Sequence, residues 1–158
     1  MVGRTRYRLP LNDSLGRKFG ALTDRLDLRV LASAPRGGSS GDSTFALQRG
    51  TPVPALDGPV FYGSLPVRIA RELRQAPTDA ILAQSPYEAL AAFAGRTLAR
   101  SNAAVVVEVH GDWRTWSRLY GSPARAVVAP LADRAALVFA AAGIVLGVAT
   151  LVLVLAGR

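Results

Sequence analysis

Apolar residues recur in the first part of the chain with the spacing of one helix face. Between residues 13 and 28 they stand three or four positions apart, at Leu15, Phe19, Leu22 and Leu26. This period predicts an amphipathic helix, with Asp13 or Ser14 as its N-cap. Residues 28–32 then form an apolar run of strand length. Residues 2–4 predict only the end of a strand that is truncated at its start.

The middle of the chain is dominated by residues that favour turns. Residues 35–58 are rich in glycine, proline, serine and aspartate, which predicts a long loop. Its glycines lack the spacing of a nucleotide-binding G-x-G-x-x-G or P-loop motif. Residues 59–62 predict a short strand, and residues 67–73 predict a helix that ends before Pro77.

Residues 79–109 give the most informative local pattern. An apolar run at 79–84 is followed by Ser85-Pro86-Tyr87-Glu88, where serine is an N-cap, proline occupies the first helical position and glutamate completes a capping box. A helix to about residue 100 and a β-branched strand at 105–109 follow. This βαβ unit predicts a parallel sheet.

Ligands of open parallel sheets bind beyond the carboxyl ends of the strands. Here those ends are Gln84-Ser85 and His110-Gly111-Asp112, so the single histidine of the chain lies where a ligand is expected. His110 either donates a hydrogen bond to a ligand or caps the strand. Trp113 either forms the rim of a binding site or packs a loop onto the domain. A Ser85-His110-Asp112 triad is disfavoured because it lacks a nucleophile elbow.

The last part of the chain, residues 135–157, is apolar on every face. It contains no charged residue, and Thr150 is its only polar side chain. As a helix it is roughly 34 Å long, enough to cross a hydrocarbon core of about 30 Å. More arginines precede this segment than follow it, which predicts a single-pass membrane protein with residues 1–134 in the cytoplasm.

Composition narrows the classes of chemistry. The chain has no cysteine, which excludes disulfides and thiolate chemistry, and one histidine without paired carboxylates predicts no metal site. The net charge of +8 comes almost entirely from arginine. This excess indicates either a phosphate-binding surface or a compositional bias. The arginines are scattered and not interleaved with aromatic residues, so nucleic acid is not an expected partner.

Several of these segments together resemble the acceptor-side half of GT-B glycosyltransferases, most closely the retaining family 4 or group 1 enzymes. The resemblance covers about residues 2–134 and is carried by residues 3–11, 79–87, 105–109, His110-Gly111-Asp112-Trp113, 119–123 and 130–134. It implies a Rossmann-like α/β fold, and transfer of a hexose from a nucleotide-sugar, with retention and without a metal or other cofactor.

The resemblance also assigns residues to the site. His110 matches the family's histidine near the donor sugar, and we take it as the catalytic candidate. Gly3 and Arg4 match the loop near the donor phosphates. Candidate substrate-binding residues are Gly3, Arg4, Arg6, Ser85, Gly111, Asp112 and Trp113.

The family's donor-binding second domain is missing, because residues 135–157 stand where it is expected to begin. The sequence therefore leaves two functions open. One is a membrane-anchored glycosyltransferase-like protein that acts on a glycan or lipid-linked acceptor, incomplete alone or paired with a separate donor domain. The other is a non-catalytic, membrane-anchored α/β docking protein.

Overall fold

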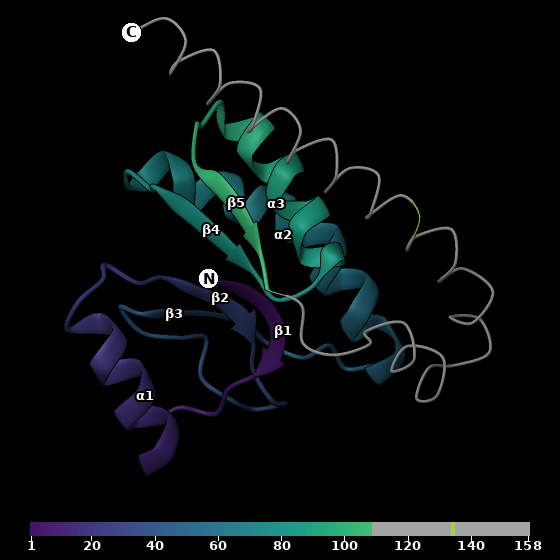
Figure 1. Cartoon of the computed structure of the whole chain (residues 1–158). Helices are drawn as coiled ribbons and strands as arrows, with labels where there is room; N and C mark the ends of the chain where they lie inside the picture. Colours follow the sequence, from purple (N-terminus) through teal and green to yellow (C-terminus); the bar gives the residue numbers. More distant parts are fainter. Residues whose placement is uncertain (109–133, 135–158) are drawn as a thin grey trace, which may run out of the picture.

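The computed structural model describes residues 1–108 and residue 134 (Figure 1). In chain order its elements are β1 (Val2–Arg6), α1 (Asp13–Thr23), β2 (Val30–Ser33), β3 (Phe45–Gln48), a 3-10 turn (Pro54–Leu56), α2 (Asp57–Gln75), β4 (Ala80–Ala83), α3 (Pro86–Ala99) and β5 (Ala104–Val107). In this part of the chain, none of the helices combines the length and the apolar character needed to span a bilayer.

The five strands form one parallel sheet in the order β3-β2-β1-β4-β5. The chain moves from β1 outward to β3, then crosses back and continues from β4 to β5. This reversal is the arrangement of Rossmann-like, doubly wound domains, and it places the switch point between β1 and β4. The predicted α/β class and the parallel β4–α3–β5 unit are confirmed.

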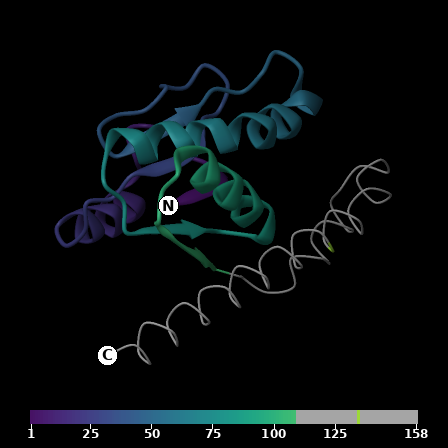
Figure 2. The same ribbon diagram turned by 90° about the horizontal axis from the view of Figure 1, so that it is seen from above.

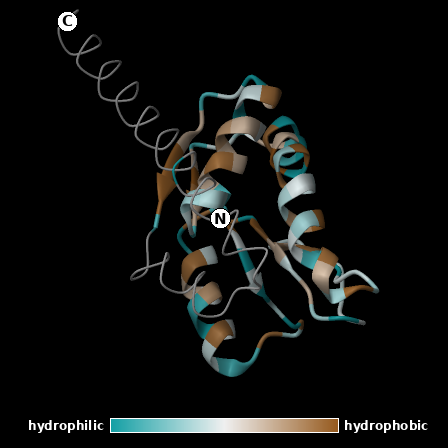
Figure 3. Cartoon of the chain, turned by 90° about the vertical axis from the view of Figure 1, so that its right-hand side faces the viewer, coloured by the Kyte–Doolittle hydropathy of each residue, from teal (hydrophilic) through white to brown (hydrophobic). Residues whose placement is uncertain are grey.

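Helices cover the two sides of the sheet differently (Figures 1 and 2). Helix α1 lies on one side and packs Phe19 against Tyr7 and Phe45, whereas α2 and α3 lie together on the other. Figure 3 shows hydrophobic and hydrophilic residues alternating around the helices, as expected of amphipathic helices packed on a sheet.

Helix α2 corrects the prediction of a strand at 59–62. Pro59 and its apolar neighbours favour a strand locally, but Phe61, Leu65 and Ile69 are spaced four residues apart and are all buried. This spacing directs them to one helix face, and Pro59 lies in the first turn, where proline is tolerated. The helix also continues through Pro66 to include the predicted segment 67–73.

Other boundaries also differ from the predictions. The prediction of a truncated first strand is wrong, because β1 has five residues and pairs with both β2 and β4. Within the predicted loop 35–58, Phe45 and Leu47 are buried and alternate with less buried neighbours, which forms β3. The side chain of Asn12 caps α1 in place of Asp13 or Ser14.

The start of α3 confirms the sequence prediction. Ser85 is the N-cap and accepts a hydrogen bond from the backbone N–H of Tyr87, and Pro86 is the first helical residue. The Ser85 hydroxyl also donates to the carboxylate of Glu88. Near its other end α3 approaches α2 closely, because Gly95 has no side chain: a Cβ there would lie 2.7 Å from Cβ of Ile69.

Candidate functional site

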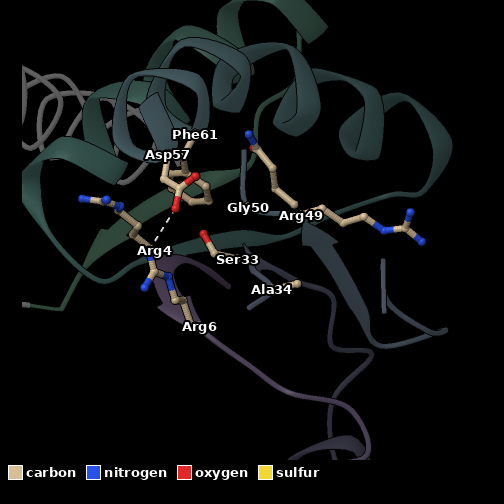
Figure 4. A pocket seen from close by; sticks show the side chains of 9 residues that line it. Arg4, Arg6, Ser33, Ala34, Arg49, Gly50, Asp57 and Phe61 are labelled. Atoms are coloured by element: carbon tan, nitrogen blue, oxygen red, sulfur yellow. Dashed lines mark hydrogen bonds and ion pairs between the residues drawn. The ribbon is translucent and has the colours of Figure 1, made fainter. Parts of the chain in front are cut away.

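An arginine-lined crevice lies where β1, β2 and β3 end and α2 begins. Figure 4 shows its lining residues, which come from the three strands, the turn after β3 and the first turns of α2: Arg4, Arg6, Ser33, Ala34, Gln48, Arg49, Gly50, Asp57 and Phe61. The site is therefore at the carboxyl edge of the sheet, the edge at which parallel α/β sheets bind their ligands.

The crevice has a narrow inner part and a wider outer part. The inner part encloses about 10 Å³, which is room for one water molecule. The adjoining outer part has a volume of about 330 Å³ and shares Arg6, Ala34, Gly50 and Asp57 with the inner one. The outer part is large enough to admit a ligand group; Arg6 borders both parts, and Arg4 lines the inner one.

Arg4 lines the inner part of the crevice. Its side chain is half-buried, and its guanidinium lies against Gly58, the second residue of α2: a Cβ at Gly58 would be 3.3 Å from Nη2 of Arg4. Among the described residues it forms no hydrogen bond or ion pair. A partly desolvated guanidinium without an anionic partner favours binding of an anion, and the positive end of α2 adds to this attraction.

Asp57, the acidic residue of the crevice lining, already has partners. Its carboxylate accepts hydrogen bonds from the backbone N–H and the hydroxyl of Thr51, each 2.7 Å long, and it pairs with Arg6 at 3.1 Å. These Thr51 hydrogen bonds, with a smaller contribution from the charges of Arg6 and Arg36, lower the pKa of Asp57 below its usual value. Asp57 therefore stays ionised and fixes the turn before α2 instead of neutralising Arg4.

Cations outnumber acids around this crevice. Arg4, Arg6 and Arg49 line it, Arg36 lines the outer part, and Asp57 is their acidic neighbour there. Arg36 donates to the backbone oxygens of Thr51 and Pro52 and so holds the loop that forms one wall. Figure 4 shows Arg4 and Arg49 extending in opposite directions, so the positive charge spreads along the edge of the sheet.

A second polar cluster lies at the start of α3. Glu88 is 3% exposed, and its carboxylate accepts hydrogen bonds from the hydroxyls of Ser85 and Tyr62, the latter at 3.0 Å. These bonds satisfy a buried acid and tie α2 to α3. Like Asp57, Glu88 therefore has its own hydrogen-bond donors and makes no ion pair with Arg4.

The structure separates the predicted substrate-binding residues that it describes. Arg4 and Arg6 lie in the crevice. Gly3 is buried under the side chain of Gln84, since a Cβ at position 3 would overlap the Gln84 amide. Ser85 uses its hydroxyl to cap α3. His110, Gly111, Asp112 and Trp113 lie outside the described residues, as do residues 135–157.

The sequence patterns did not indicate the crevice residues in the turn after β3 and at the start of α2. Arg49 and Gly50 fall in the segment predicted as a loop, and Asp57 and Gly58 precede the segment predicted as a strand. The four-residue spacing of Phe61, Leu65 and Ile69 is a signal that could have revealed α2. The first turn of α2 lies at the end of β1, where both line the crevice.

The arrangement is suited to binding an anion. Among the residues that the structure describes, no group of three or more histidine, aspartate or glutamate side chains could hold a metal ion. Comparisons with protein-family models, with curated proteins and with solved structures found no match for this chain.

Proposed function

We propose that this domain binds a phosphate-bearing ligand at the carboxyl edge of its sheet, with the ligand in the outer part of the crevice beside Arg6 and its phosphate directed at Arg4, the principal ligand-binding residue, in the inner part. The observation that supports the proposal is the half-buried Arg4 guanidinium, which has no anionic partner among the described residues. Arginine donates two parallel hydrogen bonds to a phosphate, and the amino-terminal end of α2 favours negative charge at the same place.

The ligand class follows from combining this crevice with the sequence resemblance. We propose that the domain is the acceptor-side half of a retaining, GT-B-type glycosyltransferase, and that the phosphate belongs to a nucleotide-sugar or to a phosphorylated acceptor. Arg4 and Arg6 are substrate-binding residues in this proposal, and His110 is its catalytic candidate. A separate donor domain would supply the second half of the active site.

The apolar segment adds a proposed location. Residues 135–157 are uncharged and long enough to cross a bilayer, so we propose that they anchor the domain at the cytoplasmic face of a membrane. Because the chain contains no cysteine, the single-cysteine variants Leu146→Cys and Arg158→Cys can each be tested for labelling by a membrane-impermeant maleimide. We expect protection at position 146 in intact vesicles. Labelling at position 146 without detergent would contradict the anchor.

A binding titration tests the proposed ligand class. The full chain in phosphatidylcholine nanodiscs is titrated with uridine and guanosine diphosphate sugars, with inorganic phosphate and with the free sugars. We expect saturable binding of at least one phosphate-bearing compound and none of the free sugars. Arg4→Gln is expected to weaken binding at least tenfold, since a hydrogen bond to a charged group contributes about 1.5–3 kcal/mol.

Arg17→Gln is the matched control. Arg17 is an exposed arginine of α1 on the opposite side of the sheet, so its substitution removes the same charge without touching the crevice. An equal loss of affinity in both variants would mean that only net charge matters. Binding of phosphate but of no nucleotide-sugar would retain the anion site and reject the donor as its ligand.

A further inference from the structure

The outward side of α2 is apolar, although the exposed side of a surface helix usually carries polar residues. Seven large hydrophobic residues are exposed in the part of the chain that the structure describes, and four of these lie within residues 53–67. These four residues form the α2 patch: Val53, Leu56, Val60 and Val67. Val67 is the most exposed of them, at 65%. Exposed apolar residues that gather in one place indicate a surface that another structure covers.

The residues of the α2 patch follow one another along one side of the helix. Leu56 is the N-cap residue of α2 and lies four positions before Val60, and Val67 lies seven positions after Val60. Spacings of four and seven return to the same helix face. Val53 begins the 3-10 turn that leads into α2, and it is three positions before Leu56, which is one turn of such a helix. The patch is therefore a continuous ridge on the turn and the helix.

Helix α1, on the other side of the sheet, shows the ordinary pattern (Figures 1 and 2). Its exposed positions include the charged residues Asp13, Arg17 and Lys18. In α2 no charged residue occurs between positions 58 and 67. The exposed positions of this stretch are Pro59, Val60, Gly63 and Val67. Water therefore suits the outward side of α1, whereas the outward side of α2 favours an apolar surrounding.

Arginines flank the α2 patch at both ends. At the first end, Arg36 is exposed and borders the outer crevice together with Pro54 of the 3-10 turn. At the other end, Arg71 and Arg74 are exposed in the last turns of α2. Arg71 is four positions after Val67, so it continues the same ridge.

The acidic side chains of α2 are engaged elsewhere. They are Asp57 and Glu72, and each pairs with an arginine at 3.1 Å: Asp57 with Arg6, and Glu72 with Arg29. Neither of these two ion pairs involves an arginine that flanks the patch. The α2 patch is therefore an apolar ridge between two positively charged ends.

Charge and size favour a bilayer over a second copy of the chain as the structure that covers this ridge. Two copies paired through the patch would bring their arginines together, and the chain already has a net charge of +8. Four partly exposed aliphatic side chains offer on the order of 300 Å² of surface, whereas a stable protein interface buries about 800 Å² on each partner. A bilayer interface accommodates an apolar helix face, and its anionic lipids attract the flanking arginines.

We propose that the α2 patch docks on the surface of an anionic bilayer, with Val60 and Val67 at the boundary between headgroups and acyl chains. Arg36 and Arg71 then lie among the lipid headgroups. This inference rests on the proposed membrane location and names the face of the domain that is turned toward the bilayer. Helix α1, across the sheet, faces away from it.

Fluorescence of single-cysteine variants tests this orientation. The chain has no cysteine, so Val60→Cys and Val67→Cys each carry one NBD label, whose emission rises in apolar surroundings. Leu26→Cys is the matched control, because Leu26 is 56% exposed but follows α1. The full chain is placed in phosphatidylcholine nanodiscs with or without phosphatidylglycerol. With phosphatidylglycerol we expect emission to rise about twofold at positions 60 and 67 and to stay constant at position 26.

Two aspartate substitutions form a matched pair in the Val60→Cys background. Val67→Asp should abolish the rise in emission, because it places a carboxylate among anionic headgroups, whereas Leu26→Asp should retain the rise. Sodium chloride at about 1 M, where the Debye length is about 3 Å, should also reduce the rise. Phosphate affinity should be the same in both aspartate variants, since neither position lines the crevice.

The remaining outcomes separate this inference from the proposed anchor. Emission at positions 60 and 67 that ignores phosphatidylglycerol, or that rises equally at position 26, would overturn the α2 patch as the docking face. A rise with protein concentration in lipid-free detergent would identify a second copy as the occupant instead. If Leu146→Cys is protected from maleimide but positions 60 and 67 do not respond, the anchor stands and this inference fails. If Leu146→Cys is labelled but they do respond, the patch docks without that anchor.

Discussion

The two sides of the sheet are built from different residues. On the α1 side, three aromatic rings, Tyr7, Phe19 and Phe45, pack with centroids 4.9 to 5.5 Å apart. On the α2–α3 side, small residues such as Ala91, Ala92 and Gly95 bring two helices close together. The aromatic rings fill the space between α1 and the sheet, and the crevice lies on the other side, at the start of α2.

Removing an aromatic ring from the α1 side should have the largest effect on stability. Phe19→Ala deletes a buried ring that contacts both Tyr7 and Phe45. We expect the free energy of unfolding to fall by about 3–5 kcal/mol, as for other buried phenylalanines. Urea unfolding of the full chain measures this change. Because the α1 side carries no ligand residue, phosphate affinity of the folded protein should be unchanged; a large loss of affinity would mean that the two sides are not independent.

Two glycine substitutions compare the helices directly. Gly95→Ala places a Cβ against Ile69 and the backbone of Pro66, so we expect a loss of about 1–3 kcal/mol. Gly16 in α1 has open space around it, and Gly16→Ala should stabilise the protein by up to about 1 kcal/mol through helix propensity. Thermal unfolding should show opposite shifts. Shifts of the same sign would contradict the close α2–α3 contact.

Ser85→Ala separates a structural role from a ligand-binding one. The hydroxyl caps α3 and donates to the buried Glu88 carboxylate. Its loss should lower the free energy of unfolding by about 1–2 kcal/mol, with phosphate affinity retained. Unchanged stability with a tenfold loss of affinity would instead place Ser85 in the ligand site, as the sequence predicted.

The smallest effect is a dependence of stability on pH through Asp57. Its pKa in the folded protein is lowered, so its ionised form stabilises the fold at pH values above the ordinary aspartate pKa. This contribution is lost as the pH falls below about 4. The difference in stability between the native chain and Asp57→Asn should therefore shrink between pH 5 and pH 3. A difference that stays constant over this range would contradict the Thr51 hydrogen bonds as the cause.

The sequence predicted elements best where local signals agreed. The Ser85-Pro86-Glu88 start of α3 and its flanking strands depend on capping and on short apolar runs, and the structure confirms them. The sequence predicted α2 poorly because Pro59 and Pro66 interrupt the local helical pattern. In the structure the helix forms nevertheless, because it buries Phe61, Leu65 and Ile69 on one face. Local pattern also cannot report that β1 pairs with both β2 and β4.

The same limit applies to the candidate site. Arg4 and Arg6 were predicted through a resemblance, but their surroundings depend on Gly50, Asp57 and Gly58, which are remote in sequence. Gly3 was predicted in the same way, and the structure places it beneath Gln84. That Arg4 has no acidic partner among the described residues depends on the folded sheet, where Asp57 pairs with Arg6 and accepts hydrogen bonds from Thr51.

The central claim is that an anion binds at Arg4, and one NMR titration tests it directly. Selective ¹⁵N-glycine labelling of the full chain gives at most fifteen amide signals. Adding inorganic phosphate should shift Gly58 and Gly50, which lie at the crevice, and leave Gly16 and Gly20 of α1 in place. Arg4→Gln should abolish the Gly58 shift. Saturating phosphate that leaves Gly58 unmoved, or that moves Gly16 and Gly20 equally, would contradict the claim.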